Sequence, residues 1–328
     1  MNKIQTVEKL SARKEKKGFG HILSDLSMPI LLVLLIVFFS LMTPAFFTQL
    51  NLTNILVQNV HVAVCTTGVF IIMISGGCDL SIGYQMAVAA VLVAKAITTG
   101  ALSIPMAIIL GIILCMLLGT FNGVMSQLLK SHTMIVTLAT MAVFQGIAYL
   151  ITNSKNIHNL PHAYMYIGQG RLFGWLPLNI VIAVVVIVIA GVIMAKTSIG
   201  RKVYAAGDNP EAARLAGLSV VKIKILAFTF AGLLVGIAAV LFSARNGYAN
   251  AATGSGIEFT GITACVLAGV ALKGGEGTLW KSIVAVYVLG VLTNGMQLLD
   301  LGTYPQYIAK GALMLISLYL SNRNAKTA

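Results

Sequence analysis

Long apolar runs alternate with short polar segments along the whole chain. Several runs approach or exceed the ~20 apolar residues that a helix needs to cross a bilayer. The strands of a membrane barrel would alternate apolar and polar positions, so these continuous blocks predict helices instead. The pattern therefore predicts an all-α membrane protein of about ten spans. The predicted spans are Met28–Phe47, Ile55–Ser75, Tyr84–Thr98, Pro105–Leu128, Met134–Thr152, Leu176–Ala195, Ile223–Ala244, Ile257–Leu272, Ser282–Leu299 and Gln306–Leu320.

One polar interruption, SGGCDLSIGYQ at Ser75–Gln85, falls between the second and third predicted spans. It can be a cytoplasmic turn in which Asp79 or Ser81 caps the next helix. It can also be a break within a helix beside a transport path, because irregular backbone is tolerated at membrane depth where it is buried in protein or faces a cavity. Both interpretations remain open at this stage.

A similar polar, glycine-containing interruption recurs later in the chain. GSGIEFTGI (Gly254–Ile262) places Glu258 as Asp79 is placed in the first break, and GTFNG, with Asn122, is echoed by GVLTNG, with Asn294. In the ten-span count, each segment enters the membrane from the side opposite its counterpart. The echoes predict inverted repeats, in which transporters form their paths at the repeat interface. The candidate path residues are Asp79, Ser81, Asn122, Glu258 and Asn294.

Composition and charge agree with a membrane protein. The chain is 58% hydrophobic, has a mean hydropathy of +0.92 and carries a net charge of +13. If the N-terminus is cytoplasmic, 17 of the 22 lysines and arginines lie on the cytoplasmic side. Because this is the asymmetry that the positive-inside rule describes, the charge indicates topology, with the lipid bilayer as partner and no nucleic acid.

This topology divides the chain into three parts. Residues 1–27 are expected to be a cytoplasmic tail, residues 28–320 the transmembrane domain with a cytoplasmic loop at 197–222, and residues 321–328 a second cytoplasmic tail. Both termini are then cytoplasmic. Two arginines, Arg171 and Arg245, are among the few basic residues on the outer side, which makes them candidates to contact an acidic partner there.

A polar block, Gly200–Lys224, interrupts the apolar pattern in the middle of the chain and predicts a short helix. Asn209 is a favourable N-cap and Pro210 suits the first helical position. Glu211 lies at the positive end of the helix dipole, and Gly217 supplies a left-handed C-cap. An interfacial loop whose lysines and arginines contact lipid headgroups would explain the basic residues but not the two caps. We therefore expect a helix on which a partner protein docks. Its residues are Asn209, Pro210, Glu211, Ala212, Ala213, Arg214, Leu215, Ala216 and Gly217.

Other chemistry finds little support in the sequence. The four cysteines are scattered through apolar segments, and no nucleophile–base pair or metal cluster is apparent, so neither an enzyme nor a metal site is predicted. GEGTLWKS (Gly275–Ser282) resembles a phosphate-binding loop, but Trp280 stands where the second glycine must be. Only Asp79 and Glu258 approach the spans as acids, too few for a proton relay. The chain is expected to bind no cofactor.

Three motifs resemble a known family. EAARLAG (Glu211–Gly217) fits the EAA-x-x-x-G signature of permease subunits of ATP-binding-cassette importers. GGCDLSIG (Gly76–Gly83), GRKVYAAGDNPEAARLAGLSV (Gly200–Val220) and VLAGVALKGGEGT (Val266–Thr278) together look like the ribose/xylose/galactoside branch. The resemblance covers nearly the whole chain, and it departs at Cys78, where that branch more often has an aliphatic residue.

The resemblance implies an inner-membrane permease of about ten helices that works as a dimer with a second permease copy. A cytoplasmic ATPase subunit, which carries the ATP and Mg²⁺, is expected to dock on the helix at Pro210–Ala216. An extracytoplasmic binding protein is expected to deliver a sugar or related small polar solute. Alternative solutes are an autoinducer furanone, a nucleoside or a branched-chain amino acid. An ion-coupled secondary transporter using Asp79 or Glu258 is the alternative from a different class.

Overall fold

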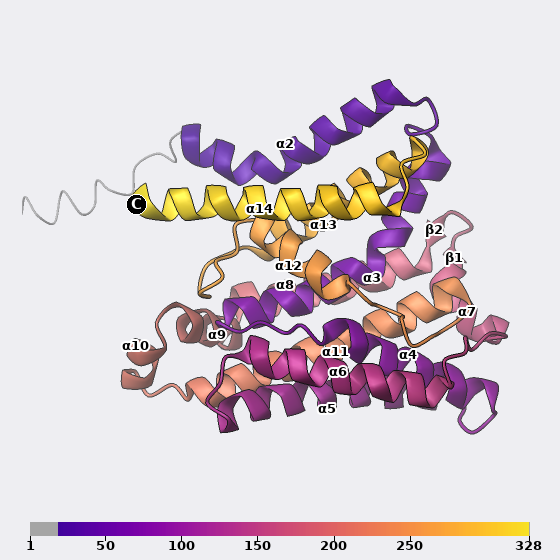
Figure 1. Ribbon diagram of the computed structural model, residues 1–328, viewed down its shortest axis with the longest axis horizontal. Helices are drawn as coiled ribbons and strands as arrows, with labels where there is room; N and C mark the ends of the chain where they lie inside the picture. The colour runs from indigo at the N-terminus through magenta and orange to yellow at the C-terminus, as the bar shows by residue number, and fades with distance from the viewer. Residues whose placement is uncertain (1–18, 328) are drawn as a thin grey trace, which may run out of the picture.

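The computed structural model describes residues 19–327, which form thirteen α-helices and one two-stranded hairpin (Figure 1). Before the hairpin come α2 (Phe19–Met42), α3 (Gln49–Ile74), α4 (Ile82–Thr98), α5 (Ile104–Leu128), α6 (Thr133–Thr152) and α7 (His162–Gln169). The hairpin pairs β1 (Arg171–Leu172) antiparallel with β2 (Leu176–Pro177). After it come α8 (Leu178–Lys196), α9 (Ser198–Asp208), α10 (Pro210–Leu215), α11 (Val220–Asn246), α12 (Ile257–Leu267), α13 (Leu279–Leu298) and α14 (Thr303–Thr327).

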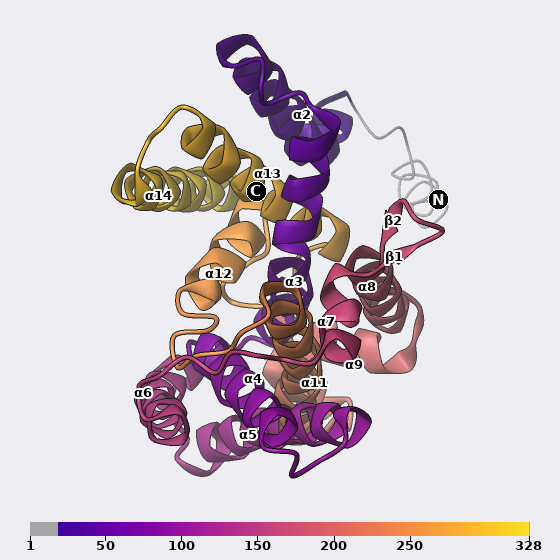
Figure 2. The same cartoon turned by 90° about the vertical axis from the view of Figure 1, so that its right-hand side faces the viewer.

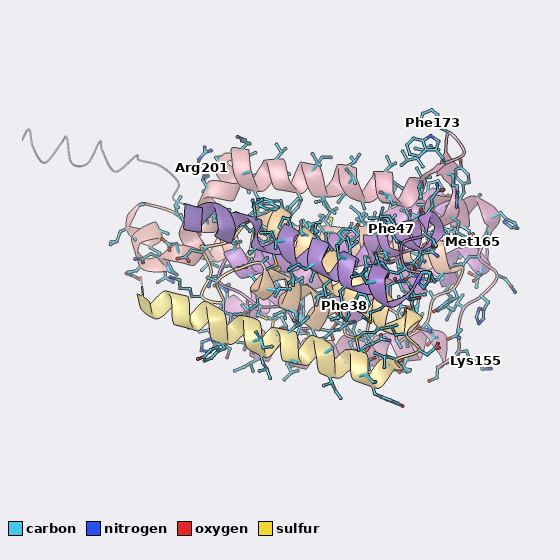
Figure 3. The ribbon with its side chains drawn as sticks, turned by 90° about the horizontal axis from the view of Figure 1, so that it is seen from above. Phe38, Phe47, Lys155, Met165, Phe173 and Arg201 are labelled. Atoms are coloured by element: carbon cyan, nitrogen blue, oxygen red, sulfur yellow. The ribbon has the colours of Figure 1, made fainter. Side chains whose placement is uncertain are left out.

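The long helices run in roughly one direction, so the molecule has two distinct ends (Figure 1). One end carries α9 and α10 and is called the α10 end here. The opposite end carries α7 and the β1–β2 hairpin and is called the hairpin end. In a view from above, Arg201 of α9 marks the first end and Phe173, at the hairpin tip, marks the second (Figure 3).

Helices α3 and α11 pass through the centre of the bundle, and α12 lies between α14 and α4 (Figure 2). Helix α11 packs on α3, α4, α5 and α7. Its contact with α5 depends on two GxxxG patterns, because Gly119 of α5 lies against the Phe228 carbonyl and Gly232 of α11 lies against the Cys115 carbonyl. Small residues at such a contact let two backbones approach closely.

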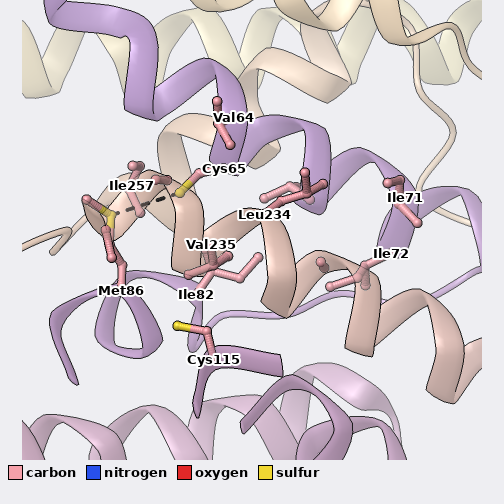
Figure 4. Packing of buried hydrophobic residues seen from close by; sticks show 14 of the residues in the cluster. Val64, Cys65, Ile71, Ile72, Ile82, Met86, Cys115, Leu234, Val235 and Ile257 are labelled. Carbon is pink, nitrogen blue, oxygen red and sulfur yellow. Dashed lines mark hydrogen bonds between the residues drawn. The ribbon is translucent and has the colours of Figure 1, made fainter. Parts of the chain in front are cut away.

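The main hydrophobic core lies where α3, α4, α5, α11 and α12 meet (Figure 4). Cys65 of α3 and Met86 of α4 touch there through their sulfur atoms, 3.9 Å apart, beside Ile257 of α12. Cys115 of α5 and Leu234 of α11 close the other side. Cys65, Cys115 and Cys265 are free and buried, which is how small apolar side chains behave.

Each of the ten predicted spans overlaps a helix, so the fold is all-α, as predicted for a membrane protein. Six helices of the described residues are long and apolar enough to cross a membrane: α3, α5, α6, α8, α11 and α13. Leu26–Met42, Ile82–Thr98 and Ile257–Leu267 are shorter apolar helices. The count of ten spans therefore stays a prediction.

Several boundaries differ from the sequence prediction. Helix α2 begins at Phe19, before the predicted start of its span, and α14 continues to Thr327 through the segment expected to be a tail. Helices α7 and α9 and the β1–β2 hairpin were not predicted, because they are short, and β2 takes the first two residues of the predicted span Leu176–Ala195. The basic residues at positions 1–18 lie outside the described residues.

Candidate functional site

The break between α3 and α4 is a non-helical segment, residues 75–81, that enters the bundle from the α10 end. Two of its backbone amides donate to side chains of α6. The Cys78 amide donates to Thr133 Oγ1 at 2.8 Å, and the Leu80 amide donates to Thr137 Oγ1 at 3.1 Å. Irregular backbone inside a membrane domain needs such partners, because no water replaces a lost helical bond.

Asp79 lies at the inner end of this break and is only 3% exposed. Its Oδ1 accepts from the Ser81 amide at 2.8 Å and from the Ser81 hydroxyl at 2.7 Å. Its Oδ2 accepts from Gln85 Nε2 at 2.9 Å and from Asn122 Nδ2 at 3.4 Å. Ser81 Oγ in turn accepts from Gln85 Nε2 and Asn122 Nδ2. The carboxylate is thus held by donors from its own turn, from α4 and from α5.

These contacts decide the local geometry of the break. Ser81 is the residue preceding α4, and its side chain makes no cap hydrogen bond. The Asp79 carboxylate accepts a hydrogen bond from the Ser81 amide, just before α4, and not from an amide within the first turn of the helix. The structure brings Asp79, Ser81 and Asn122 together, as the sequence predicted for a path, while their role in transport stays a prediction.

The second break, residues 247–256, enters from the hairpin end and leads into α12. Glu258, in the first turn of α12, is 1% exposed. Its Oε1 accepts from the Gly256 amide at 3.2 Å, and its Oε2 has no hydrogen-bond partner among the described residues. This buried acid has fewer donors than Asp79.

The two breaks meet at a pair of glycines, Gly83 and Gly254. A methyl group on Gly83 would meet the Gly254 carbonyl oxygen at 2.5 Å and would also collide with the Glu258 carboxylate. Helix α4 runs from this crossing toward the hairpin end, and α12 runs toward the α10 end (Figure 1). Two half-length helices that start at one crossing and run in opposite directions are the inverted arrangement that the sequence echoes predicted.

Asn294, the remaining candidate path residue, lies away from Asp79. Its side-chain amide exchanges two hydrogen bonds of 2.9 Å with Asn51, which ties α13 to the first turn of α3. Asn122 lies in the half of the bundle near the α10 end and Asn294 in the half near the hairpin end. Because the two repeats are inverted, Asn122 and Asn294 lie in different halves of the bundle. The similar motifs relate the two residues in sequence, but they do not belong to one group in space.

Gln85 belongs to the Asp79 group and was not predicted as a site residue. Its amide bonds both Asp79 and Ser81, and it is 1% exposed. The sequence could have indicated Gln85, because it follows Ser81 by four residues and so lies on the same helix face. The Gln85 Oε1 and Asn122 Oδ1 atoms have no hydrogen-bond partner among the described residues.

Helix α10 has the predicted caps. Asn209 Oδ1 accepts from the Ala212 amide at 3.0 Å, and Gly217 adopts a positive φ of 82°. The Gly217 amide donates to the Arg214 carbonyl and the Leu218 amide to the Ala213 carbonyl, the pattern of a Schellman motif. The helix ends at Leu215, one residue earlier than predicted, with Ala216 as C-cap. Leu215 is 85% exposed.

Helix α9 connects α10 to the first break. Gly207 of α9 lies against the Ile74 carbonyl at the end of α3, and the same carbonyl accepts from the Gly275 amide at 2.9 Å. The Tyr204 hydroxyl donates to the Gly277 carbonyl at 2.9 Å. Burial raises the pKa of the Tyr204 phenol, so it remains a neutral donor. The α9–α10 unit is therefore joined to both the end of α3 and the loop after α12.

Arg171 and Arg245 both lie at the hairpin end, as predicted for the face opposite α10. Arg171 begins β1 and is exposed. Arg245 lies in the last turn of α11, and its carbonyl accepts from Gln169 Nε2 at 2.8 Å. Their proposed contact with a partner stays a prediction. In the described part of the chain, no three His, Cys, Asp or Glu residues are grouped to hold a metal ion.

Comparison with known proteins identifies the relatives of this chain. The family described as branched-chain amino acid transport system / permease component matches residues 51–318. The ribose import permease protein of Bacillus subtilis (strain 168) is 32% identical over 320 residues, which cover 97% of this chain and 99% of that protein.

Two relatives from Escherichia coli (strain K12) are similar over nearly as much of the chain. The L-arabinose transport system permease protein is 32% identical over 315 residues, 96% of this chain and 95% of that protein. The ribose import permease protein is 31% identical over 302 residues, 90% of this chain and 92% of that protein. No solved structure matches the chain.

Proposed function

Since this chain belongs to the branched-chain amino acid transport system / permease component family, we propose that it is the translocation subunit of an ATP-driven sugar importer. The relatives named above are similar to this chain over nearly their full length, and their names describe permeases for ribose import and L-arabinose transport. A monosaccharide is therefore the favoured solute. The chain itself is proposed to be non-catalytic, with ATP and Mg²⁺ bound by a separate cytoplasmic ATPase.

The observation that carries this proposal is helix α10. It is short, capped at both ends, and exposes an apolar side chain, Leu215, among polar neighbours. Leu215 is 85% exposed, so the described part of the chain leaves it largely uncovered. Association with a partner would bury it, at roughly 25 cal/mol per Å² of apolar surface removed from water.

The contacts of α9 would transmit a movement of α10 to the end of α3 and the first break. A rotation of α10 would move Gly207 against the Ile74 carbonyl, and Ile74 immediately precedes the first break. The break carries Asp79 at its inner end, where its hydrogen bonds join α4 and α5. ATPase movement would in this way change the position of α4 against α5 without any contact between nucleotide and solute.

The remaining partners follow from the two ends of the molecule. With the α10 end cytoplasmic, the hairpin end faces the extracytoplasmic binding protein, and both termini are cytoplasmic. Lysines and arginines support this orientation, because Lys130, Lys196, Arg201, Lys202, Arg214, Lys222, Lys224, Lys273 and Lys281 all belong to the α10 end. A second permease copy and a location in the inner membrane complete the proposed importer.

Reconstitution tests the proposal. The chain, its ATPase and its binding protein are placed in liposomes with radiolabelled ribose or arabinose. Uptake should require ATP and all three proteins, and a proton or sodium gradient should not replace ATP. Gradient-driven uptake by the chain alone would establish the ion-coupled alternative. Uptake of a furanone, a nucleoside or a branched-chain amino acid in place of either sugar would correct the solute.

A charge-reversal test addresses the binding-protein face. Arg171→Glu combined with Arg245→Glu should lower the rate of uptake at low concentrations of loaded binding protein, because charges at an interface rim mainly tune association. The effect should diminish at high salt, where exposed charges are screened. Lys155→Glu, an exposed change at the same end, is the control. Unchanged uptake in the double variant would remove both arginines from the docking surface.

A further inference from the structure

A polar pocket of about 180 Å³ lies between α3, α12, α13 and α14, apart from the Asp79 group. Its walls carry side-chain amides from Gln58, Asn59, Asn294 and Gln297, hydroxyls from Thr260 and Thr293, and the ammonium of Lys310. Polar side chains inside a membrane domain are costly and usually mark a path or a site. Of the residues that line it, only Asn294 was discussed above, through its hydrogen bonds to Asn51.

Several of these groups keep unused hydrogen-bonding capacity. Asn59 Nδ2 donates to the Ile55 carbonyl at 2.8 Å, and Thr293 Oγ1 donates to the Leu289 carbonyl at 2.9 Å, so both retain free acceptor sites. Gly290 allows the Asn59 side chain to lie directly against α13, since a methyl group there would be 2.8 Å from Asn59 Oδ1. The wall is held in position while its outward-facing atoms can bind a solute.

Lys310 sets the charge of the pocket. It is partly buried, and it forms no ion pair with a described residue. No carboxylate lines the pocket. Lys310 follows Thr303 by seven residues, which places it about 10 Å along α14 from the helix start. An ammonium at that depth, facing amides and hydroxyls, creates a positive site with many hydrogen-bond partners.

The size of the pocket limits its occupant. A volume of about 180 Å³ holds about six waters at ~30 Å³ each, which corresponds to a small polyol and excludes a nucleotide. Amides and hydroxyls can both donate to and accept from ring or chain hydroxyls. Lys310, which has no ion-pair partner among the described residues, adds preference for a negative group.

We propose that this pocket is a solute subsite that binds a monosaccharide-sized polyol and prefers the sugar acid to the neutral sugar. In the orientation proposed above, it opens in the outer half of the membrane, where the binding protein would release its solute. This inference rests on the proposed function, because it specifies the solute class of the same importer.

Charge-selective labelling tests the electrostatic part. Thr293→Cys is introduced into the full chain in nanodiscs, and its reaction with an anionic and a cationic methanethiosulfonate of similar size is timed. The anionic reagent should react faster. Lys310→Gln should lower the anion-to-cation rate ratio by about tenfold or more, as removal of one unit charge from the same small pocket implies, and Lys310→Arg should preserve it. Leu301→Cys, on the exposed turn before α14, is the control whose ratio should stay within about twofold.

Protection by solute tests the binding part. D-Ribonate at millimolar concentration should slow labelling of Thr293→Cys more than D-ribose does, and Lys310→Gln should abolish that difference. Leu301→Cys should be unaffected by either compound. The inference is overturned if Lys310→Gln leaves the rate ratio unchanged, if neither compound protects, or if ribose protects as well as ribonate.

A second position guards against a misfolded variant. Gln297→Cys lines the same pocket and should behave as Thr293→Cys does. Failure of both cysteines to react means that solute cannot reach the pocket, which also overturns the inference. ATP-driven uptake by the unmodified importer separates the two proposals: uptake without protection rejects only the pocket, and protection without uptake rejects only the transport function.

Discussion

Asp79 is a buried carboxylate that hydrogen-bond donors surround and stabilise. Each partner is a neutral group: a backbone amide, a hydroxyl and two side-chain amides. Buried charges are costly unless hydrogen bonds replace the lost water. Because those donors come from the break, from α4 and from α5, the same bonds that satisfy the charge also fix three segments relative to one another.

Removing one donor should therefore destabilise the bundle. Asn122→Leu keeps a similar volume but deletes the bonds to Ser81 Oγ at 2.7 Å and to Asp79. Hydrogen bonds to charged groups contribute about 1.5–3 kcal/mol each, so the free energy of unfolding should fall by about that amount. Thermal unfolding in detergent, followed with a thiol-reactive dye that detects the buried cysteines as they become exposed, measures the change.

Asn246→Leu is the matched control for that experiment. Its side-chain amide bonds only the Phe242 carbonyl of its own helix, at 2.9 Å. The loss should be small, since no charge is left without a partner. Equal midpoints for Asn122→Leu and Asn246→Leu would mean that the Asp79 group does not stabilise the fold.

Gly83 makes a second residue-level prediction, at the crossing of the two breaks. Gly83→Ala would push a methyl group into the Glu258 carboxylate and into the Gly254 carbonyl, and the second contact is with backbone that cannot turn away as a side chain can. We expect little folded protein in the membrane. Gly146→Ala is the control, because nothing lies within 4 Å of that position in α6 and alanine favours a helix by about 0.5–1 kcal/mol over glycine. Size-exclusion profiles of both variants compare folded yields, and normal yield for Gly83→Ala would refute the close crossing.

At the scale of elements, we expect α10 to act through its shape. Among the described residues it forms one ion pair, Glu211 with Arg214 at 3.8 Å, which is exposed on both sides and adds little stability. The caps contribute more, because six helical residues provide few internal hydrogen bonds. Loss of a cap should therefore disorder the helix, whereas loss of a surface charge should not.

Three substitutions separate shape from charge. Gly217→Val places a β-branched residue at φ 82° and should abolish transport and solute-stimulated ATP hydrolysis. Glu211→Lys opposes the helix dipole by about 0.3–1 kcal/mol and should weaken both. Lys222→Gln should change little. All three should insert normally, so uptake and ATPase rates of the reconstituted importer are compared. Should Lys222→Gln be the most harmful and Gly217→Val silent, α10 would be a headgroup contact instead of a docking helix.

The helices were predictable because apolar length and caps are local properties. The ten apolar runs all became helices, and Asn209 and Gly217 became the caps of α10. Tertiary contacts were not predictable in the same way. Thr133 and Thr137 look like ordinary helix residues until the break packs on them, and Asn51 has no motif that indicates its bonds to Asn294. Sequence located the breaks, and only packing revealed their partners.

At the scale of the whole molecule, the two breaks and the charges define one axis. One break enters from the α10 end, which collects basic residues, and the other enters from the hairpin end. The two meet at Gly83 and Gly254, inside the main core. An inverted pair of this kind gives each side of the membrane an equivalent entry, which suits a protein whose solute must leave on the side opposite its arrival.

Orientation is the prediction on which this axis depends. Positive residues are retained on the cytoplasmic side, so Asp208 at the α10 end should face the cytoplasm and Phe173 at the hairpin tip should face outward. Asp208→Cys in intact cells should resist a membrane-impermeant maleimide and react after the cells are opened. Phe173→Cys, whose native side chain is 87% exposed, should react in both conditions. Of the native cysteines, Cys65, Cys115 and Cys265 are buried and Cys78 is partly exposed, so both variants are made in a Cys78→Ser background. Labelling of Asp208→Cys in intact cells, with Phe173→Cys protected, would invert the molecule, move the Lys310 pocket to the cytoplasmic half and leave α10 facing the wrong side for an ATPase.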